Sequence, residues 1–369
     1  MRRMRVVLAP DKFAGTLSAV EAAAAMAEGW RRRAQHDELV AVPMSDGGPG
    51  FVDVLADAVD GRLHAVTVPG PYGDDVPAVI LEHGDTAYVE TAMAVGLTLT
   101  PEGDRRPEEG STRGVGVLLA EALSLGVRRV VLGLGGSATN DGGAGLLAAL
   151  GATCVGGSLE AGPAGLVDLE SVDLQRARDL VRGVELVVAS DVDNPLLGIN
   201  GATKIYGPQK GLPEQRLVTV DAWLQHFADL TDRKLAGAKG AGAAGGLGFA
   251  LMLLGATRQP GVTLVAEAVG LSEAVASADL VITGEGAFDF SSRSGKVPYG
   301  VAEVATAHLV PCIALAGQVL IGQREMRALG VESAYAVVDL VGEERSMGAP
   351  ADALAELAER VARTWSART

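Results

Sequence analysis

Residues 5–33 read RVVLAPDKFAGTLSAVEAAAAMAEGWRRR, and this stretch decides the fold class. Its first six residues form a mostly apolar run that ends at Pro10 and is followed by Asp11, which predicts a buried strand followed by a turn. Ser18 and Glu21 have capping-box spacing, and the alanine-rich sequence after them favours a helix. The three closing arginines suit the negative end of a helix dipole. The stretch therefore predicts a strand, a turn and a helix in succession.

Similar short apolar runs that end near Gly, Pro or Asp recur along the chain. They lie at residues 39–44, 63–69, 78–82, 87–91, 128–134, 186–189, 280–283, 312–316 and 334–340. Continuous rather than alternating apolarity indicates strands that are covered on both faces. Helical patterns lie between many of these runs, at residues 18–33, 114–125, 214–235 and 351–363. Strands that alternate with helices predict an α/β protein with a largely parallel sheet.

The chain has 369 residues, a length that suggests two domains. The stretch 63–91 contains three expected strands with no helix between them, which is typical of antiparallel or mixed sheet. The flanking segments 1–62 and 280–369 return to strand–helix alternation. We therefore expect a discontinuous Rossmann- or flavodoxin-like domain, formed by 1–62 and 280–369, with a mostly parallel sheet. A second, mixed-sheet α/β domain formed by 63–279 would interrupt it.

The charge and cysteine content exclude several classes of protein. With 31 Lys and Arg against 46 Asp and Glu, the net charge is −15, which argues against a surface for nucleic acid or anionic membrane. The two cysteines are far apart and show no metal-site spacing, which fits a reducing cytoplasm. The charge-free stretches 142–159 and 240–257 are interrupted by glycine, so we interpret them as buried loop-plus-helix segments rather than membrane spans.

Acidic side chains follow several of the expected strands, at the sheet edge where open α/β folds bind ligands. They are Asp11, Asp46, Asp191, Asp193, Glu285 and Asp289. Each alone could be an ordinary turn residue or helix cap. Several acids at one sheet edge would repel one another unless a cation lay among them. Magnesium, held by one or two carboxylates and substrate phosphates, is the simplest such cation.

The stretch RRVVLGLGGSATNDGGAGLLAALG (128–151) has the succession of elements that is typical of an anion-binding site. An expected strand is followed by a glycine turn and then by a helix. Gly133, Gly135 and Ala138 match a dinucleotide fingerprint, but no suitable acid follows about twenty residues later. Asn140 and Asp141 could simply cap the helix. The glycines of GAAGGLGFALMLLG (242–255) permit either backbone approach to a ligand or close helix packing.

Two lysines lie among glycines that would expose them, Lys210 in YGPQKG (206–211) and Lys296 in SRSGKVPYG (292–300). Lysine binds phosphate as a mobile point charge, although either residue could be an ordinary surface lysine. The spacing before Lys296 is not that of a Walker A loop. The five histidines show no metal-ligand spacing, and no GxSxG nucleophile motif is present.

Taken together, several motifs resemble the bacterial glycerate kinases. The matching segments run in the family's order, as APDKFAGTLSAVEAA (9–23), VPMSDGGPG (42–50), GLGGSATNDGGAGLLAALG (133–151), SDVDNPLLGINGAT (190–203), YGPQKG (206–211), GAGAAGGLGFAL (240–251) and ITGEGAFDFSSRSGKVPYGVA (282–302). The resemblance implies a kinase that transfers the γ-phosphoryl group of ATP, with Mg²⁺, to D-glycerate, mainly giving 2-phosphoglycerate. It also implies two α/β domains with the active site in the cleft between them.

On this resemblance we assign roles to the candidate residues as a hypothesis. Asp191 and Asp193 are expected to be magnesium ligands or the catalytic base, and Lys210 and Lys296 are counted with them as catalytic. The expected substrate- or phosphate-binding residues are Asp11, Lys12, Asp46, Gly135, Gly136, Ser137, Asn140, Asp141, Glu285 and Asp289. Glycerate and ATP are the expected partners, and whether the chain forms a homodimer is left open.

Four positions depart from the family's motifs. Ala14, Pro49, Phe51 and Ser291 replace the usual Lys or related polar residue, Glu, Thr and Gln, respectively. These departures leave open a changed hydroxy-acid substrate or a non-catalytic metabolite sensor. An NAD(P)-dependent oxidoreductase is a further alternative, which rests on the fingerprint at residues 133–138.

Overall fold

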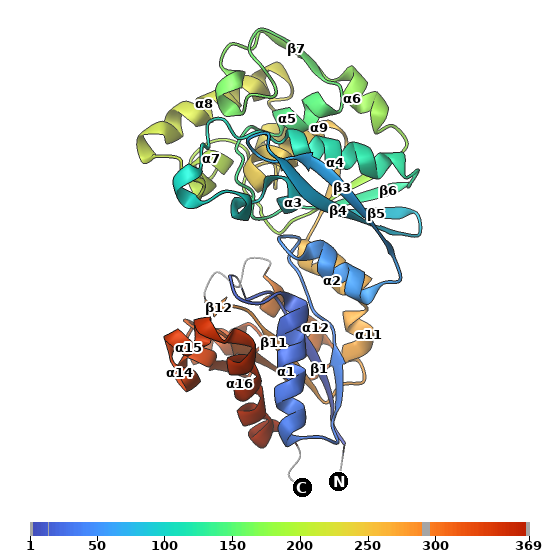
Figure 1. The fold of residues 1–369 in the computed structure, drawn as a ribbon, viewed down its shortest axis with the longest axis vertical. Helices are drawn as coiled ribbons and strands as arrows, with labels where there is room; N and C mark the ends of the chain where they lie inside the picture. The colour runs from blue at the N-terminus through green and yellow to red at the C-terminus, as the bar shows by residue number, and fades with distance from the viewer. Residues whose placement is uncertain (1–2, 14, 290–295, 367–369) are drawn as a thin grey trace. The chain divides into compact units, whose positions relative to one another are not determined.

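The computed structural model describes residues 3–13, 15–289 and 296–366 (Figure 1). Contacts divide the chain into two compact units. We call Met1–Asp46, Asp53–Val59 and Gly261–Thr369 the terminal unit, and Gly47–Val52 and Asp60–Pro260 the central unit. The sequence-based domain bounds, 1–62 with 280–369 and 63–279, stay a prediction. In the contact-based division, α10 (Gly261–Ala268) and α11 (Leu271–Val275) belong to the terminal unit.

The terminal unit is built on a five-stranded parallel sheet. Its strand order is β15 (Ser333–Ala336), β13 (Cys312–Ala316), β11 (Leu280–Gly284), β1 (Arg5–Pro10) and β2 (Glu38–Ala41). Every residue of β11 and β13 is buried, as their continuous apolar runs predict. Numbered along the chain, the order is 2-1-3-4-5, the flavodoxin-like arrangement, which confirms the expected fold class.

The order in which strands are added to this sheet reverses between β1 and β11. From β1 the chain continues to β2 on one side, whereas β11, β13 and β15 extend the sheet on the other side. In open α/β sheets, ligands bind beyond the carboxyl ends of the strands at such a switch point. The residues that follow β1 and β11 are therefore the first place to look for a site.

Helices cover this sheet. They are α1 (Ala19–Arg33), α12 (Val297–Ala307), α13 (Gln323–Ala328), α14 (Val337–Val341), α15 (Glu343–Gly348) and α16 (Pro350–Trp365), and α2 (Phe51–Ala58) starts in the central unit and continues here. The capping box of Ser18 and Glu21 is present at the start of α1. Helices α1 and α16 lie side by side (Figure 1). A Cβ on Gly29 would lie 1.9 Å from Ala355 O, so only glycine permits this approach.

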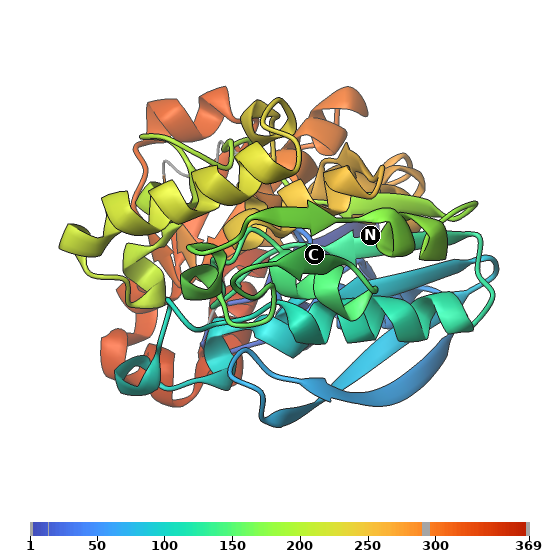
Figure 2. The ribbon, with the colours of Figure 1, turned by 90° about the horizontal axis from the view of Figure 1, so that it is seen from above.

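The central unit contains a six-stranded mixed sheet, seen from above in Figure 2. Its order is β10 (Thr257–Gln259), β9 (Glu185–Ala189), β6 (Arg129–Gly133), β5 (Thr86–Glu90), β4 (Asp75–His83) and β3 (Arg62–Pro69). The first four strands are parallel, and β3, β4 and β5 form an antiparallel meander. The mixed character expected from the stretch 63–91 is confirmed.

The helices of the central unit are short apart from two. They are α3 (Ala92–Val95), α4 (Arg113–Ser124), α5 (Ala144–Ala149), α6 (Gln175–Leu180), α7 (Ala202–Tyr206), α8 (Leu217–Leu230) and α9 (Leu247–Leu253). A small hairpin sheet pairs β7 (Thr153–Val155) with β8 (Ser171–Asp173). The glycine-rich stretches thus contain α5 and α9, and no helix in the described part of the chain is long and apolar enough to span a membrane.

One expected strand is partly wrong. The run 334–340 was expected to be extended throughout, but the strand ends at Ala336 and α14 begins at Val337. Short apolar runs do not separate a buried strand from a buried helix by periodicity alone, because both are apolar on every side.

Candidate functional site

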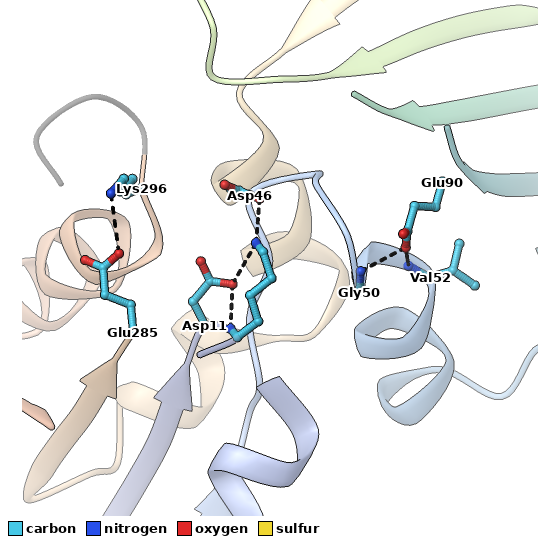
Figure 3. A network of polar contacts seen from close by, with 8 residues as sticks. Asp11, Asp46, Gly50, Val52, Glu90, Glu285 and Lys296 are labelled. Atoms are coloured by element: carbon cyan, nitrogen blue, oxygen red, sulfur yellow. Dashed lines mark hydrogen bonds and ion pairs between the residues drawn. The ribbon is translucent and has the colours of Figure 1, made fainter. Parts of the chain in front are cut away.

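Charged side chains gather at the switch point of the terminal unit (Figure 3). Asp11 directly follows β1 and Glu285 directly follows β11. The ammonium Nζ of Lys12 lies 3.5 Å from Asp11 Oδ1 and 3.4 Å from Asp46 Oδ1. The structure thus brings together three of the acids that the sequence placed after separate strands, with a lysine among them.

Lys296 is part of the same edge of the sheet. It precedes the first residue of α12, and its Nζ lies 3.6 Å from Glu285 Oε2 and 3.8 Å from Asp289 Oδ1. Its side chain is partly exposed, so its ammonium can meet a ligand. We call Asp11, Lys12, Asp46, Glu285, Asp289 and Lys296 the switch-point cluster.

Asp11 has the most perturbed acid–base chemistry of this cluster. Burial, together with the neighbouring carboxylates of Asp46 and Glu285, raises the pKa of its carboxyl group to about 7. Lys12 opposes this rise through its charge and through a backbone N–H that donates to Asp11 Oδ1 at 2.7 Å. For Lys12, burial lowers the pKa, but Asp11 and Asp46 outweigh burial and the net shift is upward. Asp11 can therefore exchange a proton near neutral pH, which is typical of functional sites.

In the central unit, the turn after β6 encloses Lys210. This lysine was expected to be exposed by its glycine neighbours, and that expectation is wrong, because it is only 2% exposed. Its Nζ donates to Ser137 Oγ at 2.9 Å and to the carbonyl of Thr139 at 2.6 Å. Burial lowers its pKa to about 7, against the opposing charge of Asp141. Lys210 thus holds the glycine turn from inside, and a catalytic role for it stays a prediction.

Asp141 is also buried within this turn. Its Oδ2 accepts hydrogen bonds from the N–H of Thr112 at 2.9 Å, the hydroxyl of Thr112 at 2.8 Å and the N–H of Gly145 at 3.1 Å. Its Oδ1 accepts from Gly143 N–H at 3.0 Å. Burial nevertheless raises the pKa of its carboxyl group. The neighbouring Asn140 donates from Nδ2 to Thr203 Oγ1 at 3.0 Å. Both residues brace the turn, and direct contact with a substrate stays a prediction.

Replacing Asp141 with Ala is expected to lower the free energy of unfolding by about 3 kcal/mol, because buried donors on Thr112, Gly143 and Gly145 lose their acceptor. Denaturant unfolding followed by circular dichroism measures the change. Asp173→Ala is the control, since Asp173 is exposed and accepts one local backbone bond from Gln175. Equal stability of the Asp141→Ala protein and wild type would show that water replaces the carboxylate at no cost.

Gly135 and Gly136 approach the segment 47–49. A Cβ on Gly135 would lie 2.6 Å from Gly48 Cα, and one on Gly136 would lie 2.9 Å from Pro49 Cγ. Close backbone packing therefore already requires both glycines. Their role as a phosphate cradle stays a prediction.

Two of the departures from the family's motifs lie in this region. Pro49 packs next to Gly136, and Phe51 is fully buried, with its ring edge-on to Tyr88 at 6.2 Å between centroids. Phe51 is thus a core residue of the central unit. The other two departures, Ala14 and Ser291, lie outside the described residues.

Glu90 is a further acid at a strand end, and the sequence analysis missed it. It is the last residue of β5, is 4% exposed and accepts hydrogen bonds from the N–H groups of Gly50 at 3.0 Å and Val52 at 3.4 Å (Figure 3). The rule that selected Asp11 and Asp191 could have found it. It was overlooked because it was counted as part of the strand.

Asp191 and Asp193 both follow β9, but their surroundings differ. Asp191 is half-buried, whereas Asp193 is 60% exposed and forms ion pairs with Arg258 at 2.8 Å and Lys239 at 3.3 Å. Among the described residues, no group of three His, Cys, Asp or Glu side chains is arranged to hold a metal ion. A metal bound here would therefore need ligands from the substrate as well.

The dinucleotide fingerprint does not have its usual structural context. Such a fingerprint should open a helix at once, but α5 begins only at Ala144, six residues after Ala138. The N-cap position of α5 is Gly143, and the intervening residues form the turn around Lys210. This geometry gives no support to a nicotinamide site at residues 133–138.

Comparisons with known proteins agree with the motifs. The model of the glycerate kinase family matches residues 6–366. The chain is 42% identical to a glycerate kinase of Bacillus subtilis (strain 168), over 91% of this chain and 90% of that protein. It is 40% identical to a glycerate 2-kinase of Escherichia coli (strain K12), over 92% of both.

A solved structure shows the same fold. A crystal structure named as a glycerate kinase 2 from Salmonella typhimurium LT2 superposes with a TM-score of 0.81 at 36% identity and covers 98% of each chain. The family match thus spans almost the whole chain, and its charged motifs include the switch-point cluster and the turn around Lys210. The chain therefore is an enzyme of the glycerate kinase family.

Proposed function

We propose that this enzyme transfers the γ-phosphoryl group of ATP to D-glycerate, with magnesium, and that the product is 2-phosphoglycerate. The observation that carries the proposal is the family match over residues 6–366, to relatives named glycerate kinase and glycerate 2-kinase. The charges of the site suit this reaction, because phosphoryl transfer depends mainly on positioning and on charge neutralisation.

Individual residues can supply these functions. Lys12 and Lys296 offer cations to a phosphate or to the glycerate carboxylate. Asp191 is the stronger candidate for a base that accepts the proton of the attacking hydroxyl, because it is half-buried, whereas the side chain of Asp193 is 60% exposed.

Carboxylate oxygens are also the donors that magnesium prefers, and one or two of them suffice when phosphates complete the coordination. The donor set of this chain therefore fits the ion. As the alternative to the role of base, Asp191 would hold the ion, and Asp193 would join only after leaving Arg258 and Lys239. Bound magnesium would offset the negative charge of the phosphates.

ADP release tests the proposal. With ATP and magnesium, we expect D-glycerate to give the highest kcat/KM in a panel of small hydroxy acids, and chelation of the metal to abolish the signal. Phosphorus NMR of the product should show the phosphate on C2. The Asp191→Asn protein, purified in the same way, controls for contaminating kinases. Absence of ADP release with every acid would reject the proposal.

The alternative of a non-catalytic metabolite sensor predicts a different result. D-glycerate would then raise the Tm of the protein without any ADP release. Phe51 weakens the case for this alternative, because the structure accommodates it as a core residue of the central unit. A changed hydroxy-acid preference would instead appear as higher kcat/KM for another member of the panel.

A further inference from the structure

A mostly apolar cavity of about 250 Å³ lies within the terminal unit, next to the switch-point cluster. Its lining residues include Phe13, Gly286, Ala287, Val338, Met347 and Leu354. Phe13 is the neighbour of Lys12, and Gly286 is the neighbour of Glu285, so the two segments that leave the switch point also form the cavity wall. Consecutive Cα atoms are about 3.8 Å apart, so the cavity and the cluster adjoin.

Two segments that follow the central strands of the terminal sheet contribute to the lining of the cavity. Two short strands, β12 (Ala287–Phe288) and β14 (Gln318–Val319), continue from the ends of β11 and β13 and pair in parallel. A Cβ on Gly317 would lie 2.4 Å from Gly286 O, so these backbones touch directly. Helices α14, α15 and α16 lie beside this small sheet (Figure 1). The cavity is thus lined by residues of this small sheet and of the three helices.

The charge distribution separates the cavity from the cluster. Among the described residues that line the cavity, Glu343 is the only one with a charge, and it is exposed. The cavity therefore gives no counter-charge to a phosphate or to the carboxylate of a hydroxy acid. It suits an uncharged ring, and an exposed methionine in its lining, Met347, can adapt to such a ring. The lysines for attached phosphates lie in the adjoining cluster.

We propose that this cavity binds the purine base of the phosphoryl donor, with the phosphates directed toward Lys12 and Lys296. The inference rests on the proposed use of ATP and adds the place where the base binds. Its volume is below the range of about 300–1,000 Å³ that is usual for whole ligands, which fits one ring system rather than a complete nucleotide.

Met347→Glu tests the cavity without disturbing the core, because Met347 is 61% exposed. We expect the KM for ATP to rise about tenfold, with the KM for D-glycerate and kcat unchanged. The neutral Met347→Ser should also raise the KM for ATP. The apolar Met347→Leu should keep the KM for ATP at the wild-type value. Leu320→Glu is the matched control, since Leu320 is 64% exposed in the same unit and does not line the cavity.

Two partial ligands separate the base from the phosphates. Adenosine, which carries no phosphate, should raise the Tm of wild type and of Leu320→Glu but not that of Met347→Glu. Tripolyphosphate, which carries no base, should compete with ATP equally well in all three proteins. An unchanged KM for ATP in Met347→Glu, or no effect of adenosine on wild type, would overturn the inference. If adenosine raises the Tm of wild type but wild type releases no ADP with D-glycerate, the proposed function fails and the proposed site for the base stands.

Discussion

Replacing Asp191 with Asn is expected to lower the turnover number by about 10²–10⁴-fold, the usual contribution of a general base. Asn has nearly the same shape as Asp but cannot accept a proton and is a weaker ligand for a divalent cation. Because Asp191 is only half-buried, its replacement should leave the Tm close to that of wild type. Steady-state ADP release and a thermal melt measure the two quantities.

Asp193→Asn is the matched comparison, from the same loop after β9. Asp193 is exposed, so its ion pairs with the exposed Lys239 and the part-buried Arg258 contribute only about 1 kcal/mol to stability, and we expect a much smaller fall in turnover. A turnover of the Asp191→Asn protein within a few-fold of wild type would remove Asp191 from the catalytic role. If Asp193→Asn lowers the turnover number more than Asp191→Asn does, the role of the base belongs to Asp193 and not to Asp191.

Replacing Asp11 with Asn is expected to stabilise the fold at neutral pH while lowering activity. The carboxyl group has an unfolded pKa of 3.8 and a folded pKa of about 7. One pKa unit corresponds to about 1.36 kcal/mol, so at a pH above both pKa values the gain in unfolding free energy is roughly 4 kcal/mol. Charged groups held in a buried functional site commonly destabilise the fold in this way.

The sign of the pH dependence follows from the same pKa difference. Between pH 3.8 and 7 the unfolded chain loses the proton and the folded chain keeps it, so the contribution of Asp11 to stability falls as the pH rises. The advantage of Asp11→Asn should therefore be absent near pH 4, grow toward pH 7 and stay constant above it. Urea unfolding across this range, with Asp57→Asn as an exposed control, measures the difference. A constant difference at all pH values would show that Asp11 ionises as an ordinary surface carboxyl group does.

The sequence predicted the fold well where local pattern and burial agree. The run 312–316 is fully buried as β13, and Ser18 with Glu21 starts α1, because apolar continuity and capping depend on neighbouring residues alone. Cluster formation by Asp11, Asp46 and Glu285 was also foreseeable, since parallel strands place their carboxyl ends at one edge.

Lys210 shows what the sequence could not reveal. Its burial depends on two oxygen acceptors that lie more than seventy residues earlier in the chain, on Ser137 and Thr139. Nothing in YGPQKG indicates that such acceptors exist, and its glycines alone predict exposure of the lysine. Phe51 is similar, because its place in the core depends on Tyr88 and on the absence of a side chain at Gly133.

The close contact of α1 with α16 has a consequence for biosynthesis. The first strand pairs with residues 280–284, and the first helix rests on one that ends at Trp365. A ribosome therefore releases all of the central unit before β11 and α16, the later partners of β1 and α1, exist. That unit can fold as the nascent chain grows, because domains generally fold as units, while the opening βα segment must await the synthesis of β11 and α16. Removal of α16 should thus leave helix α1 without its main packing partner.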